Sequence, residues 1–215
     1  MSLKINEIFY SIQGESLYAG LPCVFIRLTG CNLRCAYCDT RYAYDEGADM
    51  PLAEIIRRVE IYPRSSIVEI TGGEPLLQDK TPDLIEQLLA RHYTVLMETN
   101  GSLDISQTDR RCTKIMDIKC PSSRMHLFND LNNLRRLEPK DQVKFVMGTR
   151  TDYLYALEIL SQLPPDYPKS HVLFSPVAGV LPPQTLATWM LQDGSGARLH
   201  LQMHKIIWPE QERGV

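Results

Sequence analysis

Three cysteines lie within eight residues of one another, in the stretch GCNLRCAYCDT that covers residues 30–40. Their spacing, Cys31-x3-Cys35-x2-Cys38, is specific, because a chain with only six cysteines would rarely produce it by chance. Thiolates are soft ligands that suit zinc or an iron–sulfur cluster. A loop with three thiolates can bind three irons of a [4Fe–4S] cube and leave the fourth iron open to another ligand. The spacing therefore predicts a metal centre and favours an open-site cluster.

A structural zinc site is the alternative, and it would need a fourth ligand. Cys23 or a distant histidine could supply that ligand. The cysteines outside the loop, Cys23, Cys112 and Cys120, are otherwise expected to be small buried apolar side chains. Six cysteines in a cytosolic chain of 215 residues favour metal or redox chemistry over disulfides.

The overall composition indicates an ordinary globular protein, with 44% hydrophobic and 23% charged residues. A net charge of −3 gives no reason to expect a nucleic-acid partner. No apolar run reaches the roughly 18 residues of a membrane span. The N-terminal stretch MSLKINEIFYSIQGE lacks the continuous apolar core of a signal peptide. We therefore expect a cytoplasmic protein without a membrane partner.

Short apolar segments alternate with helical ones along the chain. Strands are predicted at 23–28, 67–71, 94–99, 114–119, 142–147, 171–175 and 199–204. Helices are predicted at 51–62, 81–93, 151–163 and 182–193, with a weaker helical pattern at 125–139. This alternation indicates βα units and a parallel sheet. Because a closed eight-fold barrel usually needs about 250 residues, we predict an α/β fold: a partial, open βα barrel with about six to seven mainly parallel strands, in one domain that covers residues 1–215.

Polar and glycine-rich segments follow most of the predicted strands. Arg27 lies near the end of the first strand, and the cysteine loop comes directly after it. Later strands are followed by TGGEP (71–75), ETNG (98–101), DIKCPSS (117–123), FSPVAG (174–179) and HKIIWP (204–209). Ligands of parallel βα folds bind at the carboxyl ends of the strands. We therefore expect these segments to meet at one rim.

The CxxxCxxC loop after a first strand resembles that of the radical S-adenosylmethionine (SAM) enzymes. The segment Thr71–Pro75 resembles the glycine-rich strand end of that family, where two adjacent glycines let the backbone approach a ligand. The resemblance implies that SAM binds the open iron through its amino and carboxylate groups. It also implies that the reduced cluster donates an electron to SAM, which releases a 5′-deoxyadenosyl radical.

Longer matches narrow the resemblance. The 7-carboxy-7-deazaguanine synthase family is similar to this chain in EIFYSIQGES (7–16), GLPCVFIRLTGCNLRCAYCDT (20–40), ITGGEPLLQ (70–78), METNGS (97–102), DIKCPSS (117–123) and HKIIW (204–208). That family of lyases converts 6-carboxy-5,6,7,8-tetrahydropterin into 7-carboxy-7-deazaguanine with loss of ammonia, in queuosine and deazapurine biosynthesis. The resemblance implies Mg²⁺ beside the [4Fe–4S] cluster and SAM, a flavodoxin- or ferredoxin-type electron donor, and a homodimer.

The resemblance also implies roles for single residues. Cys31, Cys35 and Cys38 would bind the cluster, and Thr40 would bind Mg²⁺, which takes oxygen ligands. SAM would contact Tyr37, Cys38, Asp39, Gly73, Glu74, Glu98, Asn100, Lys119, Ser122 and Ser175. The pterin substrate would contact Ile12, Gln13, Gly14, Arg27, Thr71, His204 and Pro209. An amide such as that of Gln13 offers a donor and an acceptor to a pterin edge, and the guanidinium of Arg27 can hold a carboxylate with two hydrogen bonds.

Two other functions stay open at this point. An activase that installs a glycyl radical shares the cysteine loop and the GGEP element, although SIQGE, Arg27 and HKIIW favour a small pterin-like substrate. A non-catalytic zinc or regulatory module would be colourless, whereas a cluster protein is brown. Residues 210–215 (EQERGV) extend beyond the resemblance, which leaves the role of the residues around Pro209 open.

Overall fold

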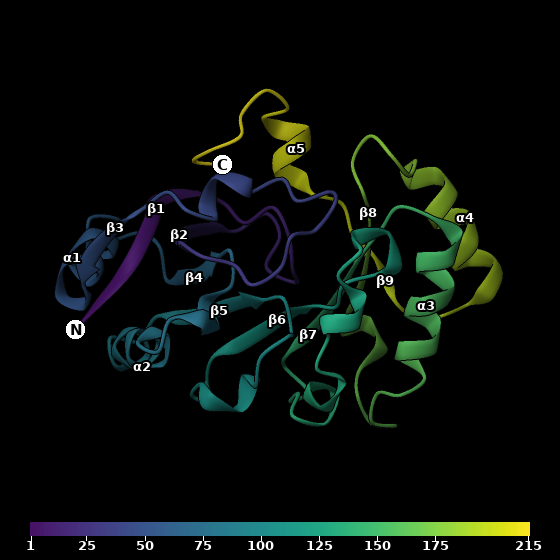
Figure 1. Cartoon of the computed structure of the whole chain (residues 1–215), viewed down its shortest axis with the longest axis horizontal. Helices are drawn as coiled ribbons and strands as arrows, with labels where there is room; N and C mark the ends of the chain where they lie inside the picture. The colour runs from purple at the N-terminus through teal and green to yellow at the C-terminus, as the bar shows by residue number, and fades with distance from the viewer.

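The computed structural model describes residues 1–215, and its strands form one open sheet (Figure 1). The strands are β1 (Ser2–Ile12), β2 (Pro22–Leu28), β3 (Ala48–Pro51), β4 (Ile67–Gly72), β5 (Thr94–Thr99), β6 (Thr113–Asp117), β7 (Gln142–Met147), β8 (Val172–Pro176) and β9 (Arg198–Leu199). Their order across the sheet is β3-β1-β2-β4-β5-β6-β7-β8-β9. All neighbours from β2 onward pair in parallel, whereas β1 pairs antiparallel with β2 and β3. The predicted α/β fold with an open, mainly parallel sheet is confirmed.

Five α-helices accompany the sheet: α1 (Leu52–Glu60), α2 (Thr81–Ala90), α3 (Arg150–Leu160), α4 (Pro183–Asp193) and α5 (Met203–Ile207). In Figure 1, α1 and α2 lie at one end of the sheet and α3 and α4 at the other, while α5 lies apart from them above the strands. None of the helices combines the length and the apolar character that crossing a bilayer requires.

Side chains on each parallel strand alternate between two faces of the sheet. One face packs against the helices in the main core, which contains Val24, Ile26, Val68 and Ile70. The other face begins with a smaller apolar cluster of Cys23, Phe25, Ile67, Leu96 and Ile115. Because the sheet is curved, this second face encloses the interior of the partial barrel (Figure 1).

Six of the seven predicted strands start and end within two residues of the observed ones. The prediction for 199–204 is wrong, because only Arg198–Leu199 pairs with β8 and the chain then turns into α5. The sequence prediction also missed β1 and β3, the two antiparallel strands. β1 mixes polar and apolar residues and β3 has only four residues, so neither contains the continuous apolar run that predicted the other strands.

The weaker helix predicted at 125–139 is also wrong. The segment forms two short 3₁₀ turns, His126–Phe128 and Leu131–Arg135. The Asp130 carboxylate accepts a hydrogen bond from the backbone N–H of Asn132, and the Asn133 amide donates to the carbonyls of residues 101 and 103. Short polar side chains of this kind compete with helical hydrogen bonds, so the local apolar pattern did not decide the structure.

Candidate active site

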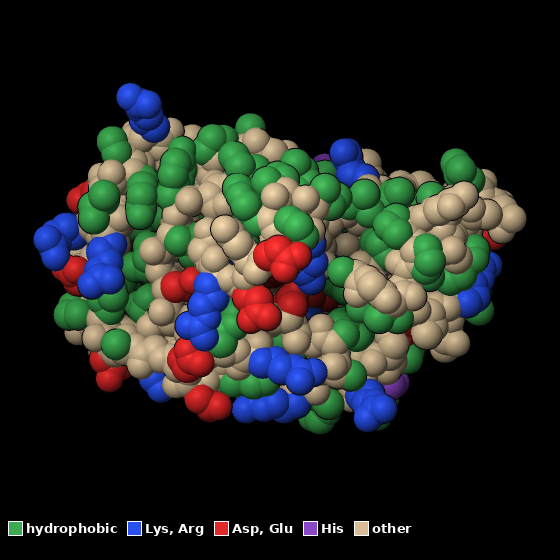
Figure 2. All heavy atoms as spheres, turned by 90° about the horizontal axis from the view of Figure 1, so that it is seen from above, with side chains coloured by type: hydrophobic (Ala, Val, Ile, Leu, Met, Phe, Trp, Pro, Cys, Tyr) green, Lys and Arg blue, Asp and Glu red, His purple; other side chains and the backbone are tan.

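A cavity of about 980 Å³ opens at the carboxyl ends of the parallel strands. Its walls come from the ends of β2 and β4–β7, the cysteine loop, the turn after β8, helix α5 and residues 208–215. Figure 2 looks onto this side of the molecule, where acidic and basic side chains meet around a hollow. The predicted rim is therefore a cavity that gathers charged groups from distant parts of the chain.

The cysteine loop is held by backbone hydrogen bonds to three neighbouring segments. The N–H of Gly30 donates to the carbonyl of Ala43 (2.8 Å), and that of Ala36 donates to the carbonyl of Ser123 (3.0 Å). The carbonyl of Gly30 accepts from the N–H of Glu74 (2.8 Å). The loop thus keeps an irregular but defined path, with its three free thiols half-buried in the cavity wall.

The three thiols fit a [4Fe–4S] cluster better than a structural zinc ion. Cys23, the proposed fourth zinc ligand, is fully buried among apolar side chains below the cavity. No group of three His, Cys, Asp or Glu side chains converges on a single ion position. Three thiolates with one position left open suit a [4Fe–4S] cluster, whose fourth iron takes another ligand. Burial raises the pKa of Cys35 to about 11, and metal binding would favour its thiolate.

Two glycines at the end of β4, Gly72 and Gly73, allow the cysteine loop to pack closely. A Cβ on Gly73 would lie 2.1 Å from the carbonyl oxygen of Gly30 and 2.7 Å from Cβ of Cys31. Gly72 has a φ of +142° and would likewise clash with the backbone of Leu28. No side chain fits at either position, so the two glycines bring the turn after β4 against the cluster loop.

Glu74 lies behind this turn and does not line the cavity. Its carboxylate is fully buried and accepts hydrogen bonds from the N–H of Leu76 (3.0 Å), the N–H of Asn100 (2.7 Å) and the hydroxyl of Thr99 (2.9 Å). These partners occupy both oxygens. The carboxylate of Glu74 therefore positions the turn and Asn100, and a contact between Glu74 and SAM stays a prediction.

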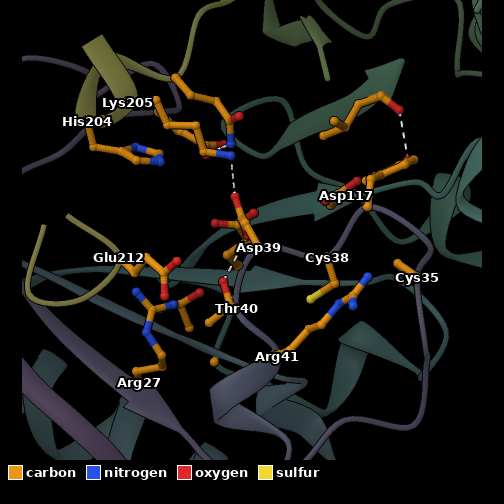
Figure 3. A pocket seen from close by; sticks show the side chains of 18 of the residues that line it. Arg27, Cys35, Cys38, Asp39, Thr40, Arg41, Asp117, His204, Lys205 and Glu212 are labelled. Atoms are coloured by element: carbon orange, nitrogen blue, oxygen red, sulfur yellow. Dashed lines mark hydrogen bonds and ion pairs between the residues drawn. The ribbon is translucent and has the colours of Figure 1, made fainter. Parts of the chain in front are cut away.

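Arg27 projects from β2 into the cavity (Figure 3). Its Nε donates to Oε1 of Glu7 (2.7 Å), and its guanidinium lies between the rings of Phe9 (5.7 Å) and Tyr42 (5.8 Å). The terminal nitrogens take no partner within the chain, so they can bind an anion bidentately. A guanidinium fixed in this way is suited to a planar carboxylate.

Charged side chains form the floor of the cavity above the inner apolar cluster. Nζ of the buried Lys144 lies 2.6 Å from Glu15 and 3.8 Å from Asp117, and it also contacts Glu98. Burial alone would lower the pKa of Lys144, but these carboxylates raise it well above its usual value. Burial would likewise raise the pKa of Glu15, but Lys144 and His204 hold it well below its usual value. Lys144 and Glu15 are therefore ionised.

Glu69, the remaining carboxylate of the floor, differs from Glu15 in its protonation state. Burial, followed by repulsion from Glu98 and Glu15, raises the pKa of Glu69 to about 8. Its side chain accepts a short hydrogen bond from the Gln13 amide, whose oxygen accepts from the N–H of Glu15 (3.0 Å). Glu69 therefore carries a proton near neutral pH.

The substitution Glu69→Gln is expected to weaken the pH dependence of stability between about pH 4.5 and 8. Because Glu69 keeps its proton in the folded chain and loses it in the unfolded chain, the free energy of unfolding falls as the pH rises through this window to about 8. Glutamine does not titrate. Urea unfolding at about pH 5 and pH 8 measures the difference, and equal pH slopes in the parent and the variant would contradict it.

Comparison with known proteins decides the family. A profile of the Radical SAM superfamily matches residues 25–127. The 7-carboxy-7-deazaguanine synthase of Koribacter versatilis is 41% identical, with 99% of this chain and 100% of the relative covered. That of Chlorobaculum tepidum is 45% identical, with 99% and 97% covered.

The chain belongs to the 7-carboxy-7-deazaguanine synthase family of radical SAM enzymes. Membership confirms the resemblance seen in the motifs, and a radical SAM enzyme implies a [4Fe–4S] cluster and SAM. The crystal structure of QueE from Escherichia coli has the same fold, with a TM-score of 0.81 at 23% identity over 95% of each chain.

Most of the residues predicted from the 7-carboxy-7-deazaguanine synthase motifs line the cavity. These are Ile12, Gln13, Gly14, Arg27, Cys31, Cys35, Tyr37, Cys38, Asp39, Thr40, Thr71, Gly73, Glu98, Asn100, Lys119, His204 and Pro209. Besides Glu74, two predicted residues lie outside the lining. The Ser122 hydroxyl bonds to the Asp152 carboxylate, and Ser175 is fully buried on β8. His204 reaches the cavity from α5 and not from a strand end.

Several cavity residues were given no role from the sequence, although Glu15, Asp117, Lys205 and Trp208 lie within the matched motifs. On the floor these are Glu15, Glu69, Asp117 and Lys144, and at the mouth they are Tyr42, Gln202, Lys205, Trp208, Gln211 and Glu212. The strand residues had a visible signal, because each is a lone charge inside an apolar run such as IVEIT or QVKFVM. A charge there is costly unless it is paired or functional. The mouth residues had no comparable signal.

Proposed function

We propose that this protein is a 7-carboxy-7-deazaguanine synthase that converts 6-carboxy-5,6,7,8-tetrahydropterin into 7-carboxy-7-deazaguanine and ammonia. The main support for the proposal is that one cavity contains both a possible cluster site and a possible carboxylate site. The cysteine loop forms one wall, and Arg27, pre-oriented for a carboxylate, lies on another. Full-length relatives with that activity in their names support the assignment.

The cofactor end would be built from the cysteine loop and the turns after β4 and β5. Cys31, Cys35 and Cys38 would ligate the cluster, and the close packing at Gly73 would leave its backbone available to SAM. Asn100, whose Nδ2 lies 3.9 Å from Sγ of Cys31, would border the same region. When bound, the cluster and SAM supply the radical that removes a hydrogen from the substrate.

The substrate end would be built from Arg27 and the charged floor. Arg27 would hold the substrate carboxylate, and the floor carboxylates Glu69 and Glu98 would face the N–H edge of the pterin with Gln13. Mg²⁺ would bind the hydroxyl of Thr40, which lines the cavity and donates to Oδ1 of Asp39 (2.9 Å). The paired ion network would keep these groups in place.

Four further features belong to this proposal. We expect residues 1–215 to act as one domain, because all the strands belong to one sheet and the cavity lies at its edge. We expect a homodimer, with a flavodoxin- or ferredoxin-type protein as the electron donor. The six free thiols accord with a reducing cytoplasm.

Product analysis by mass spectrometry tests the function. The anaerobically reconstituted protein is given SAM, a reductant, Mg²⁺ and 6-carboxytetrahydropterin. A product lighter by ammonia, formed over many turnovers without matching loss of SAM, is expected. Production of 5′-deoxyadenosine with the pterin unchanged would reject this substrate and favour an activase.

The substitution Arg27→Gln is expected to raise KM for the pterin by roughly 10- to 100-fold. Hydrogen bonds to charged groups contribute about 1.5–3 kcal/mol, and glutamine cannot form the charged pair. Arg27→Lys keeps the charge but not the planar fork, so we expect an intermediate KM. Steady-state kinetics on both variants measures the effect, and an unchanged KM in Arg27→Gln would remove Arg27 from the substrate site.

A further inference from the structure

Residues 210–215, which we call the strap, cross the mouth of the cavity. Gln211, Glu212 and Val215 line it, and Figure 3 shows the Glu212 side chain facing Arg27. The strap leaves α5 through Trp208, whose carbonyl accepts from the N–H of Gln211 (3.1 Å). It therefore lies over the place where Arg27 would hold a carboxylate.

Three contacts attach the strap to the segment that follows the cysteine loop. Nη2 of Arg213 lies 2.7 Å from Oε2 of Glu46, and the Arg213 guanidinium stacks over the ring of Tyr42 at 4.2 Å. The Tyr42 hydroxyl lies 3.2 Å from the carbonyl oxygen of Glu212. Both partners of the ion pair are half-exposed, so this attachment is weak enough to open.

Tyr42 also contacts the residues that orient Arg27. Its hydroxyl lies 3.0 Å from Oε1 of Glu7, the same oxygen that accepts from Nε of Arg27. The hydroxyl of tyrosine has one hydrogen to donate, so Tyr42 can donate it either to Glu7 or to the carbonyl of Glu212 in the strap. The position of the strap and the fixing of Arg27 are therefore linked through one side chain.

We propose that the strap is a cover for the substrate carboxylate, and that Glu7 and Tyr42 are positioning residues that couple its closure to Arg27. This inference rests on the proposed function, because it assumes a carboxylate at Arg27. A carboxylate bound there would meet the negative charge of Glu212, so the strap must shift when the ligand enters. The strap would therefore move for ligands that carry a carboxylate at this position and stay in place for analogues that lack it.

Steady-state kinetics on variants with exchanged charges tests whether the ion pair between Arg213 and Glu46 attaches the strap. Arg213→Glu and Glu46→Arg are each expected to raise KM for 6-carboxytetrahydropterin about two- to five-fold, with kcat nearly unchanged. The double variant restores the pair with reversed charges and should recover the parental KM. Arg57→Glu breaks an exposed ion pair with Glu54 on α1, far from the cavity, and serves as the control. Tyr42→Phe should raise KM about ten-fold through loss of its hydrogen bonds.

Fluorescence of Trp208 provides a readout that does not depend on turnover. Trp189→Phe removes the other tryptophan, which packs against Tyr153 away from the cavity. In that background, 6-carboxytetrahydropterin should change the Trp208 emission, and tetrahydropterin without the carboxylate should change it much less. The Arg213→Glu variant should lose most of this selectivity.

The outcomes separate the two proposals. If the parent protein neither binds nor converts 6-carboxytetrahydropterin, the proposed function fails. If the parent converts it while Arg213→Glu and Tyr42→Phe keep the parental KM and selectivity, the strap proposal is overturned and the function stands. The strap proposal is also overturned if the variants lower kcat without changing KM, or if the Arg213→Glu/Glu46→Arg double variant does not recover the parental KM.

Discussion

The substitution Cys35→Ala is expected to abolish product formation and to reduce the iron content and the visible absorbance of the reconstituted protein. Three thiolates must hold the cluster so that one iron stays open, and the loop has no other thiol to replace the lost one. Because Cys35 lies in an irregular loop at the cavity wall, its removal should leave the thermal stability of the apoprotein nearly unchanged. Iron analysis, absorbance spectra and turnover assays measure the three effects together.

Cys112→Ala is the matched control. Cys112 is fully buried in the main core, away from the cavity, so its removal creates a small void but touches no cluster ligand. We expect slightly lower stability with full iron content and activity. Normal activity and iron in Cys35→Ala, or lost iron in Cys112→Ala, would show that the cluster is bound elsewhere.

The substitution Lys144→Met is expected to lower the free energy of unfolding by about 3–5 kcal/mol at neutral pH, the usual result of removing one partner from a buried ion network. Lys144 is 4% exposed and pairs with Glu15 and Glu98, and it lies 3.8 Å from Asp117, which pairs more closely with Lys119 at 2.7 Å. Without it, these carboxylates repel one another in a region with little water. Protonation relieves the repulsion, so the loss should be smaller at about pH 5 than at pH 8. Chemical denaturation at both pH values measures it.

Lys140→Met controls for the loss of a lysine from an ion pair. Lys140 pairs with Glu138 at 3.1 Å, but its side chain is 37% exposed, so we expect a change within about 1 kcal/mol. If the two variants lost equal stability, or if Lys144→Met lost more at low pH than at high pH, the floor would not be the paired ion network described above.

Local features of the chain were predictable because they depend on few residues. The three cysteines lie on one loop in any fold, since eight residues of chain cannot carry them far apart. The six confirmed strands were found from short apolar runs bounded by helices, a signal typical of buried parallel strands. The glycines at 72 and 73 were likewise recognised from the TGGEP motif, although the carbonyl of Gly30 that excludes a side chain at Gly73 comes from a distant segment.

The failures share a physical cause, which is competition from partners that the local pattern does not contain. The strand predicted at 199–204 ends at Leu199, and the N–H of Met203 then donates to the carbonyl of Gly14 (2.9 Å), nearly two hundred residues away. The helix predicted at 125–139 is replaced by short 3₁₀ turns, where the Asn133 amide donates to the carbonyls of residues 101 and 103. In both cases a tertiary contact decided the outcome.

By itself, the sequence determined the cysteine loop, the fold class and the family, because these follow from local spacing, from strand and helix periodicity and from matched motifs. The charged floor and the strap were decided only by the tertiary structure. The floor joins Glu15 and Lys144, which are 129 residues apart, and the strap joins Arg213 to Glu46, which are 167 apart. Strand order and register bring such residues together, and neither is encoded in any single stretch of the chain.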